Sequence, residues 1–206
     1  EKRENAKQQL ASVIRENKES ADIPEHYLSA DIAAVESPEA QRIGMNYIKN
    51  FEKLGRIGLL LYGDVGTGKT YLAACIANAL LNQGVSVKWL TAMQIVERSC
   101  FYSESEYAEY TRSITAPDLL IIDDLGTELP NSFTVSQLFI CLNERILRQK
   151  STIISTNLAL EDIKSIYSER TFSRISSNYT ILRITGDDIR IQKKLLNLGG
   201  TNDVTP

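Results

Sequence analysis

The sequence predicts an α/β fold of three layers, with a mostly parallel five-stranded sheet between helices. Short apolar runs are typical of buried strands, and here they cover 57–62, 85–90, 118–124, 152–157 and 179–184. Segments of helical composition lie between these runs. Strands that alternate with helices usually pair in parallel, and the helices cover both faces of the sheet. A glycine-rich loop after the first run and two carboxylates at the end of the third mark the expected functional edge.

The loop after the first expected strand fits the phosphate-binding pattern G-x-x-x-x-G-K-[ST]. It consists of Gly63, Asp64, Val65, Gly66, Thr67, Gly68, Lys69 and Thr70, and an Ala- and Leu-rich helix over 71–81 follows. Glycines let successive backbone N–H groups face one anion, and the helix N-terminus adds a positive dipole end. In this Walker A pattern the lysine reaches the β- and γ-phosphates, and the hydroxyl ligates Mg²⁺. We therefore expect ATP and Mg²⁺ to bind here, with Tyr71 as a further nucleotide-binding residue.

Two carboxylates close the third expected strand in the form of a Walker B motif. Asp123 comes first and is placed to hold Mg²⁺, directly or through water. Asp124 is placed to orient or deprotonate the water that attacks the γ-phosphate. The alternative is a strand followed by an ordinary turn that contains aspartate.

A polar residue also ends the fourth expected strand. Ligands of open parallel sheets bind beyond the carboxyl ends of the strands, so Asn157 is expected beside the γ-phosphate. Its amide could hold the attacking water without adding charge. The alternative is a loop asparagine that caps the next segment.

Composition limits the class of protein. The chain has 206 residues and a net charge of −3, so any DNA contact must come from a local basic patch. No apolar run reaches the roughly 20 residues of a membrane span, and no signal peptide is visible. Cys75, Cys100 and Cys141 have the spacing of reduced, packed thiols in a cytosolic protein. His26 is the only histidine, which argues against a zinc site built by the protein. These observations predict a cytoplasmic protein without a membrane partner.

The chain is expected to contain one main domain. Residues 1–22 are interpreted as an N-terminal helix or linker from a missing upstream domain, 23–198 as the ATPase domain and 199–206 as a flexible tail. Within the domain, a helix capped by Ser37 is expected to run to about Leu54. Residues near 31–43 are candidates to cover the nucleotide base.

Two further segments could contact DNA or other subunits. The stretch 101–113 mixes aromatic residues with glutamates, which favours helix packing over DNA binding because acidic groups repel phosphates.

Another helix is expected over 132–149, capped by Ser132, and two short helical pieces over 158–166 and 169–175. Basic residues gather near the end of the chain, at Arg170, Arg174, Arg183, Arg190, Lys193 and Lys194.

Together the motifs resemble the AAA+ ATPases. The closer match is to bacterial replicative helicase loaders of the DnaC/DnaI type and to the related transposition ATPase IstB. The resemblance spans about 23–197 and is carried by 63–70, 120–126, Ser155-Thr156-Asn157 and 169–175. The last segment is similar to the E-R-x-x-S-R-[IL] segment of that family.

The resemblance implies an ATPase that self-associates. Asn157 matches sensor 1, and Arg174 matches the arginine finger, which reaches the γ-phosphate of a neighbouring subunit. Arg190 is similar to the sensor 2 arginine. The usual catalytic carboxylate of AAA+ proteins is glutamate, and Asp124 is one methylene shorter, which puts fast intrinsic hydrolysis in doubt. The helical lid is expected to be reduced or absent. The implied partners are single-stranded DNA and, through the missing N-terminal region, the replicative DNA helicase.

Three other functions remain open or disfavoured. A transposition ATPase of the IstB type would act as an ATP-gated adaptor and hydrolyse slowly. A P-loop small-molecule kinase would need an acceptor pocket and an arginine-rich lid, neither of which is clear in the sequence. A GTPase is disfavoured because no N-K-x-D motif occurs.

Overall fold

The expected α/β architecture is confirmed, and every strand of the sheet is parallel to its neighbours. A computed structural model describes residues 2–54, 57–99 and 103–186. Its five-stranded sheet has the order β2-β3-β4-β1-β5. The strands are β1 (Gly58–Tyr62), β2 (Val87–Thr91), β3 (Leu119–Leu125), β4 (Ser151–Thr156) and β5 (Tyr179–Arg183).

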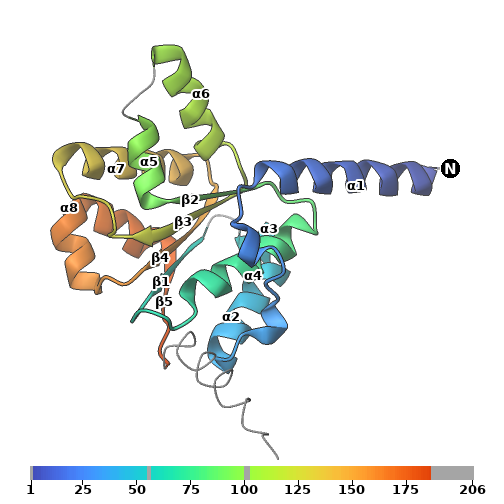
Figure 1. The fold of residues 1–206 in the computed structure, drawn as a ribbon, viewed down its shortest axis with the longest axis horizontal. Coiled ribbons are helices and arrows are strands. Elements are labelled where there is room, and N and C mark those ends of the chain that lie inside the picture. Colours follow the sequence, from blue (N-terminus) through green and yellow to red (C-terminus); the bar gives the residue numbers. More distant parts are fainter. Residues whose placement is uncertain (1, 55–56, 100–102, 187–206) are drawn as a thin grey trace, which may run out of the picture.

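Helices cover both faces of the sheet, as Figure 1 shows. The α-helices are α1 (Lys2–Ser20), α2 (Pro38–Lys49), α3 (Phe51–Leu54), α4 (Lys69–Leu81), α5 (Ala92–Ser99), α6 (Glu104–Thr115), α7 (Ser132–Leu147) and α8 (Leu160–Asn178), with 3-10 turns η1 (Glu25–Tyr27) and η2 (Ile32–Ala34). Side chains of a strand alternate between faces. Leu59 and Leu61 therefore pack in the cluster with α2 and α4, while Leu60 and Ile154 pack with α5, α7 and α8.

Three local expectations needed correction. The helix expected over 37–54 is interrupted at Asn50, where α2 ends and α3 begins one residue later. The cap of α7 is Asn131 and not Ser132, because the Asn131 side chain accepts the hydrogen bond from the Thr134 N–H. That helix also ends at Leu147 rather than near Gln149, which has a positive φ of 57°.

The aromatic stretch packs as a helix, as expected. It forms α6, where Tyr110 is buried and its hydroxyl donates to the Ile95 carbonyl. Tyr107 donates to Gln137 of α7. Cys100, Phe101 and Tyr102 lie outside the described residues.

The N-terminal helix is attached at its C-terminal end and otherwise extends away from the rest of the molecule (Figure 1). Asn17 donates to the Gly84 carbonyl at 3.0 Å. Directly after the helix, the Ala21 carbonyl accepts from the Trp89 N–H at 2.7 Å, and Lys88 pairs with Asp22. These contacts cover the outer edge of β2. An uncovered edge strand would leave its backbone N–H and C=O groups open for pairing with another strand.

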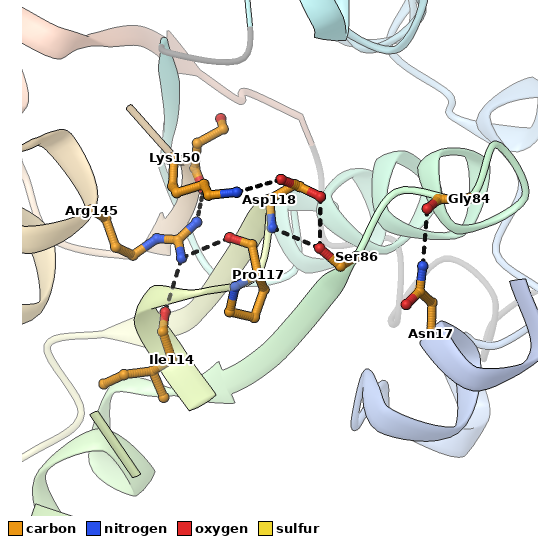
Figure 2. A network of polar contacts seen from close by, with 9 residues as sticks. Asn17, Gly84, Ser86, Ile114, Pro117, Asp118, Arg145 and Lys150 are labelled. Atoms are coloured by element: carbon orange, nitrogen blue, oxygen red, sulfur yellow. Dashed lines mark hydrogen bonds and ion pairs between the residues drawn. The ribbon is translucent and has the colours of Figure 1, made fainter. Parts of the chain in front are cut away.

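A buried arginine holds the amino end of the sheet. Arg145 of α7 is fully buried, and its guanidinium donates to the carbonyls of Ile114, Pro117 and Ser151 and to the Thr152 hydroxyl. Figure 2 shows the arginine beside a second set of contacts, in which Asp118 accepts from Lys150 and Ser86. The helices α6 and α7, the turn before β3 and the start of β4 thus meet at one guanidinium.

Some expectations concern residues that are not described. Arg190, the tail 199–206 and the residues on which the reduced or absent lid depends all follow Gly186, the last described residue. The boundaries of the proposed domain and linker remain predictions. Within the described ranges, no helix is long and apolar enough to cross a membrane.

Candidate nucleotide-binding site

The phosphate-binding loop joins β1 to α4, which is the order that the motif requires. Gly63 leaves the strand with a φ of +141°, and a Cβ on it would lie 2.2 Å from the Ile184 carbonyl oxygen. The chain after β5 therefore passes so close to the loop that only glycine fits. Gly68 immediately precedes α4, so the loop ends at the helix N-terminus, where backbone N–H groups lack helical partners.

Lys69 lies across this loop and is almost fully buried. Its Nζ donates to the carbonyls of Gly63 at 2.9 Å and Asp64 at 2.6 Å. The Thr67 hydroxyl also donates to the Asp64 carbonyl. These contacts hold the ammonium group at the mouth of the loop, on the side where the backbone N–H groups would face an anion.

Asp123 and Thr70 form a pair of oxygen donors beside the loop. The Thr70 hydroxyl donates to Asp123 Oδ1 at 3.0 Å, and Ser155 of β4 donates to the same oxygen. Burial raises the pKa of Asp123 above its ordinary value, an effect that the hydrogen bonds from Ser155 and Thr70 oppose and the charge of Asp124 reinforces. A buried carboxylate with a like-charged neighbour is well placed to bind a cation.

Asp124 lies where the pairing of the strand is irregular. The pairing of β3 with β4 shifts between Ile122 and Leu125, and Asp124 has a φ of +54°. Its N–H donates to the Ser155 hydroxyl at 3.0 Å, while its side chain is exposed. Successive side chains of a strand point to opposite faces, and here Asp123 is buried while Asp124 lines the cavity.

Many of the predicted residues line one cavity of about 310 Å³; Gly63, Asp64 and Asp123 do not, although Asp123 accepts from Thr70, which does. Its phosphate side is formed by the loop from Val65 to Tyr71, with Asp124, Thr127 and Asn157. Asn157 directly follows β4 and so lies at the expected edge. The volume is within the range of small-molecule sites.

The opposite side of the cavity comes from the segment before the first strand. From this segment, Tyr27, the run 34–37 and Ala40 line the cavity, and Ile184, which follows β5, lines it as well. Part of the segment expected to cover the nucleotide base therefore lies at the cavity. The Tyr71 hydroxyl lies 3.4 Å from the Asp31 N–H and joins this segment to α4. Contact with a base remains a prediction.

The donor set fits Mg²⁺ bound together with a nucleotide. Mg²⁺ is usually held by one or two protein oxygens, with phosphate oxygens and water completing the shell. Thr70 and Asp123 supply such a pair. Among the residues that the structure describes, no group of three or more His, Cys, Asp or Glu side chains could hold a metal alone. The phosphates are thus needed to complete the site.

The expected arginine finger is not part of this cavity. Arg174 lies on α8 with an exposed side chain, as does Arg170, and neither lines the cavity. A residue that acts on a neighbouring subunit is expected to be exposed in this way, so the role of Arg174 remains a prediction.

Sequence reasoning missed two groups at the site. Ser155 bonds both to Asp123 and to the backbone of Asp124, and Thr127 lines the cavity. A signal for Ser155 existed, since it precedes Asn157 at the strand end. No pattern distinguished Thr127 from an ordinary loop residue.

Residues 15–197 match the family model described as IstB-like ATP binding protein. The chain belongs to this family. Two curated relatives are YdaV of Escherichia coli K12, an uncharacterized protein, and the replicative helicase loader DnaI of Bacillus subtilis. YdaV is 28% identical over 68% of this chain and 58% of its own length. DnaI is 27% identical over 72% of this chain and 51% of its own length. The chain thus spans about half the length of these relatives.

Solved structures support the fold. A crystal structure of DnaI has a TM-score of 0.71 at 23% identity and covers 80% of this chain and 96% of its own. The DnaC helicase loader has a TM-score of 0.69 at 22% identity, with 79% and 100% covered. DnaA of Aquifex aeolicus, bound to AMPPCP, has a TM-score of 0.65 at 22% identity, with 86% and 57% covered. The IstB-like chain therefore has the P-loop AAA+ fold.

Proposed function

We propose that this chain is the ATP-binding and ATP-hydrolysing module of a helicase loader, which helps to place the replicative DNA helicase on single-stranded DNA. The observation that carries the proposal is that Lys69, the Thr70–Asp123 pair, Asp124 and Asn157 meet around one cavity. The likeness to the loader DnaI supports the choice of process. A cytoplasmic location and the absence of a membrane partner are parts of the same proposal.

Each residue has a separate task in the proposed reaction. Lys69 and the loop N–H groups bind the phosphates and neutralise their charge. Thr70 and Asp123 would hold Mg²⁺, which would supply positive charge beside the phosphate oxygens. Asp124 and Asn157 hold the attacking water in line with the γ-phosphate, and Asp124 accepts its proton. Because Asp124 is shorter than glutamate, we expect slow turnover until assembly or DNA improves the alignment.

The decisive experiment measures ATP turnover of the protein alone, with single-stranded DNA, and with DNA and a replicative helicase. We expect slow basal turnover that rises with DNA and a stable complex with the helicase. Turnover that is unaffected by DNA and helicase would contradict the loader assignment. Failure to bind ATP with Mg²⁺ would contradict the whole site.

The arginine finger has its own test. We expect Arg174→Ala to retain ATP affinity and to lose DNA-stimulated or assembly-dependent turnover, by as much as the roughly 10³-fold or more that such arginines contribute elsewhere. Arg183→Ala, at the end of β5, is a control at another exposed arginine. Equal turnover in Arg174→Ala and the unsubstituted protein would place the finger elsewhere.

Membership of the IstB-like family favours a second candidate, a transposition ATPase that works as an ATP-gated adaptor. Such a protein would bind ATP at the same cavity and assemble on DNA, but its partner would be a transposase. Adding each partner separately distinguishes the two functions. Stimulation by a transposase and none by a helicase would favour the adaptor.

A further inference from the structure

A buried carboxylate lies in the loop after β3, a few residues beyond Asp124, and has no part in the proposed chemistry. Glu128 is only 5% exposed, although glutamate is rarely buried without a partner. Its Oε2 accepts from the Gly126 N–H at 3.1 Å, and its Oε1 accepts from the Tyr167 hydroxyl of α8. Tyr167 is 1% exposed. This contact joins the loop after β3 to α8 across 39 positions of sequence.

The loop side of this contact is independently fixed. The Asp124 N–H donates to Ser155, the Leu125 carbonyl accepts from Thr156, and the Thr127 hydroxyl donates to the Asp124 carbonyl. All three bonds lie within the cavity wall or the end of β4. The backbone before Glu128 is therefore held in place by hydrogen bonds that do not involve the Glu128–Tyr167 contact.

The helix side of the contact lies directly before a break in α8. Ser168, the residue after Tyr167, interrupts α8 with a φ of 80° and a ψ of 155°. A non-glycine residue keeps such a strained conformation only where its surroundings enforce it. Few contacts of the described residues span the break: Ser168 caps Thr171 at 3.5 Å, and the exposed pair Lys164–Glu169 bridges it at 3.0 Å. The buried link to Glu128 therefore fixes the residue directly before the point where the second half of α8 begins.

The second half of α8 carries the expected finger. It contains Arg170 and Arg174, both exposed, and is held to the core by Thr171 and Ile175. A helix that restarts at Ser168 presents these arginines in a direction set by its first turn. A small change at this turn would move Arg174 at the surface without moving the cavity of the same subunit.

We propose that Glu128 and Tyr167 are positioning residues, which fix the restart of α8 and so aim Arg174 at the nucleotide of the neighbouring subunit. The inference rests on the proposed function, since it assumes that Arg174 acts in trans. It places the action of the pair in the subunit that donates the arginine, and not in the subunit whose nucleotide is hydrolysed.

Mixed assemblies can separate these two subunits. An Arg174→Ala subunit keeps its cavity but has no finger, while a Lys69→Ala subunit keeps its finger but cannot hold ATP. Neither is expected to turn over ATP alone with single-stranded DNA, whereas their mixture should recover turnover at junctions between them. Tyr167→Phe, which removes one hydroxyl, is then added to either partner.

With Tyr167→Phe in the Lys69→Ala partner, we expect the turnover of the mixture to fall about tenfold, as for loss of a buried hydrogen bond. With the same change in the Arg174→Ala partner, we expect turnover within about twofold of the unsubstituted mixture. Tyr110→Phe, another buried tyrosine, is the matched control and should have no effect in either partner. Glu128→Gln keeps the shape of the acceptor and replaces Tyr167→Phe as the probe if that variant does not fold, as judged by thermal unfolding and ATP affinity.

The outcomes distinguish this inference from the proposed function. An effect of Tyr167→Phe in the ATP-holding partner only, in both partners equally, or in neither would overturn the inference. An inactive mixture beside an active unsubstituted protein would overturn the role of Arg174 and the inference, but not the ATPase. An unsubstituted protein without ATP turnover would overturn the proposed function and the inference together.

Discussion

The two ends of the sheet both bury charge, but they use it differently. At the amino end, Arg145 is fully enclosed, and its guanidinium donates to three carbonyls and to the Thr152 hydroxyl. Figure 2 shows its bonds to the carbonyls of Ile114 and Pro117. At the carboxyl end, Lys69 and Asp123 are also buried, yet Lys69 lines a cavity and Asp123 accepts a hydrogen bond from Thr70, which lines the same cavity. A polar group enclosed among fixed partners holds the fold together, whereas one at the wall of a cavity is available to a ligand. In this protein, the buried charge at the amino end of the sheet thus serves stability, and the buried charges at the carboxyl end are available for ligand binding.

The carboxyl end also has less favourable electrostatics. Burial and a neighbouring carboxylate raise the pKa of Asp123, which is a sign that the charged form needs a cation. At the amino end, burial acts on Asp118 in the same direction, but hydrogen bonds from Lys150 and Ser86 outweigh it and lower the pKa. At the amino end, groups of the protein lower the pKa of the carboxylate, whereas at the carboxyl end the pKa is raised, which fits the proposed Mg²⁺ site.

The largest expected effect on stability comes from removing Arg145 at the amino end of the sheet, which we call the closed end because its buried charge is enclosed by protein groups. Arg145→Ala would leave the carbonyls of Ile114, Pro117 and Ser151 without this donor and would open a cavity. We expect the free energy of unfolding to fall by roughly 3–5 kcal/mol, the range for disrupting buried charged networks. Denaturant titration measures this loss. ATP affinity of the folded fraction should stay within about twofold.

The matched control for this variant is Arg148→Ala on the same helix. Arg148 is exposed, and in the part of the chain that the structure describes its ion pair is with Glu144, so its removal should cost under about 1 kcal/mol. A similar loss of stability in both variants would show that the enclosure of Arg145 has no special effect.

The next largest effect concerns the carboxyl end of the sheet, where Lys69 lines the cavity. Lys69→Ala removes a cation expected to make charge-assisted bonds with the phosphates, each worth about 1.5–3 kcal/mol. We expect ATP affinity to fall about 100-fold or more, with little loss of stability. Calorimetric titration with Mg-ATP measures it. Lys150→Ala, a lysine of the closed end, should leave ATP affinity unchanged, and tight ATP binding by Lys69→Ala would refute the assignment of the loop.

The smallest effect is a pH dependence at the closed end. Because the pKa of Asp118 is lowered in the folded protein, its pairing stabilises the fold above the unfolded pKa of about 4, and the benefit is lost as pH falls through the folded pKa. Asp118→Asn should therefore be less stable than the unsubstituted protein at pH 7 and equally stable well below pH 4. Since the Asp118 side chain is 47% exposed, we expect a difference under about 1 kcal/mol.

Unfolding of both proteins across this pH range tests the sign. A difference that grew as the pH fell would mean that the pKa of Asp118 is raised and that its pairing with Lys150 does not stabilise the fold. The double variant Asp118→Asn with Lys150→Ala should add little to either single change, because the two residues share one interaction.

Much of the site could be predicted from sequence because its motifs are local. A phosphate loop needs glycines and a lysine at fixed spacing, and strand ends that bear Asp123, Asp124 and Asn157 meet once the sheet is parallel. Boundaries were less predictable. Asn131 rather than Ser132 caps α7, since two adjacent residues of equal capping ability differ only in backbone angle.

The sequence by itself determined the parallel sheet, the loop that cradles phosphate and the carboxylates beside it, because strand periodicity and loop chemistry depend on near neighbours along the chain. Only the tertiary structure decided that Ser155 holds both aspartates, that 34–37 lines the cavity, and that Glu128 meets Tyr167. These contacts join residues from separate elements, and which side chains face each other depends on the packing of helices on the sheet. No spacing in the chain records that packing.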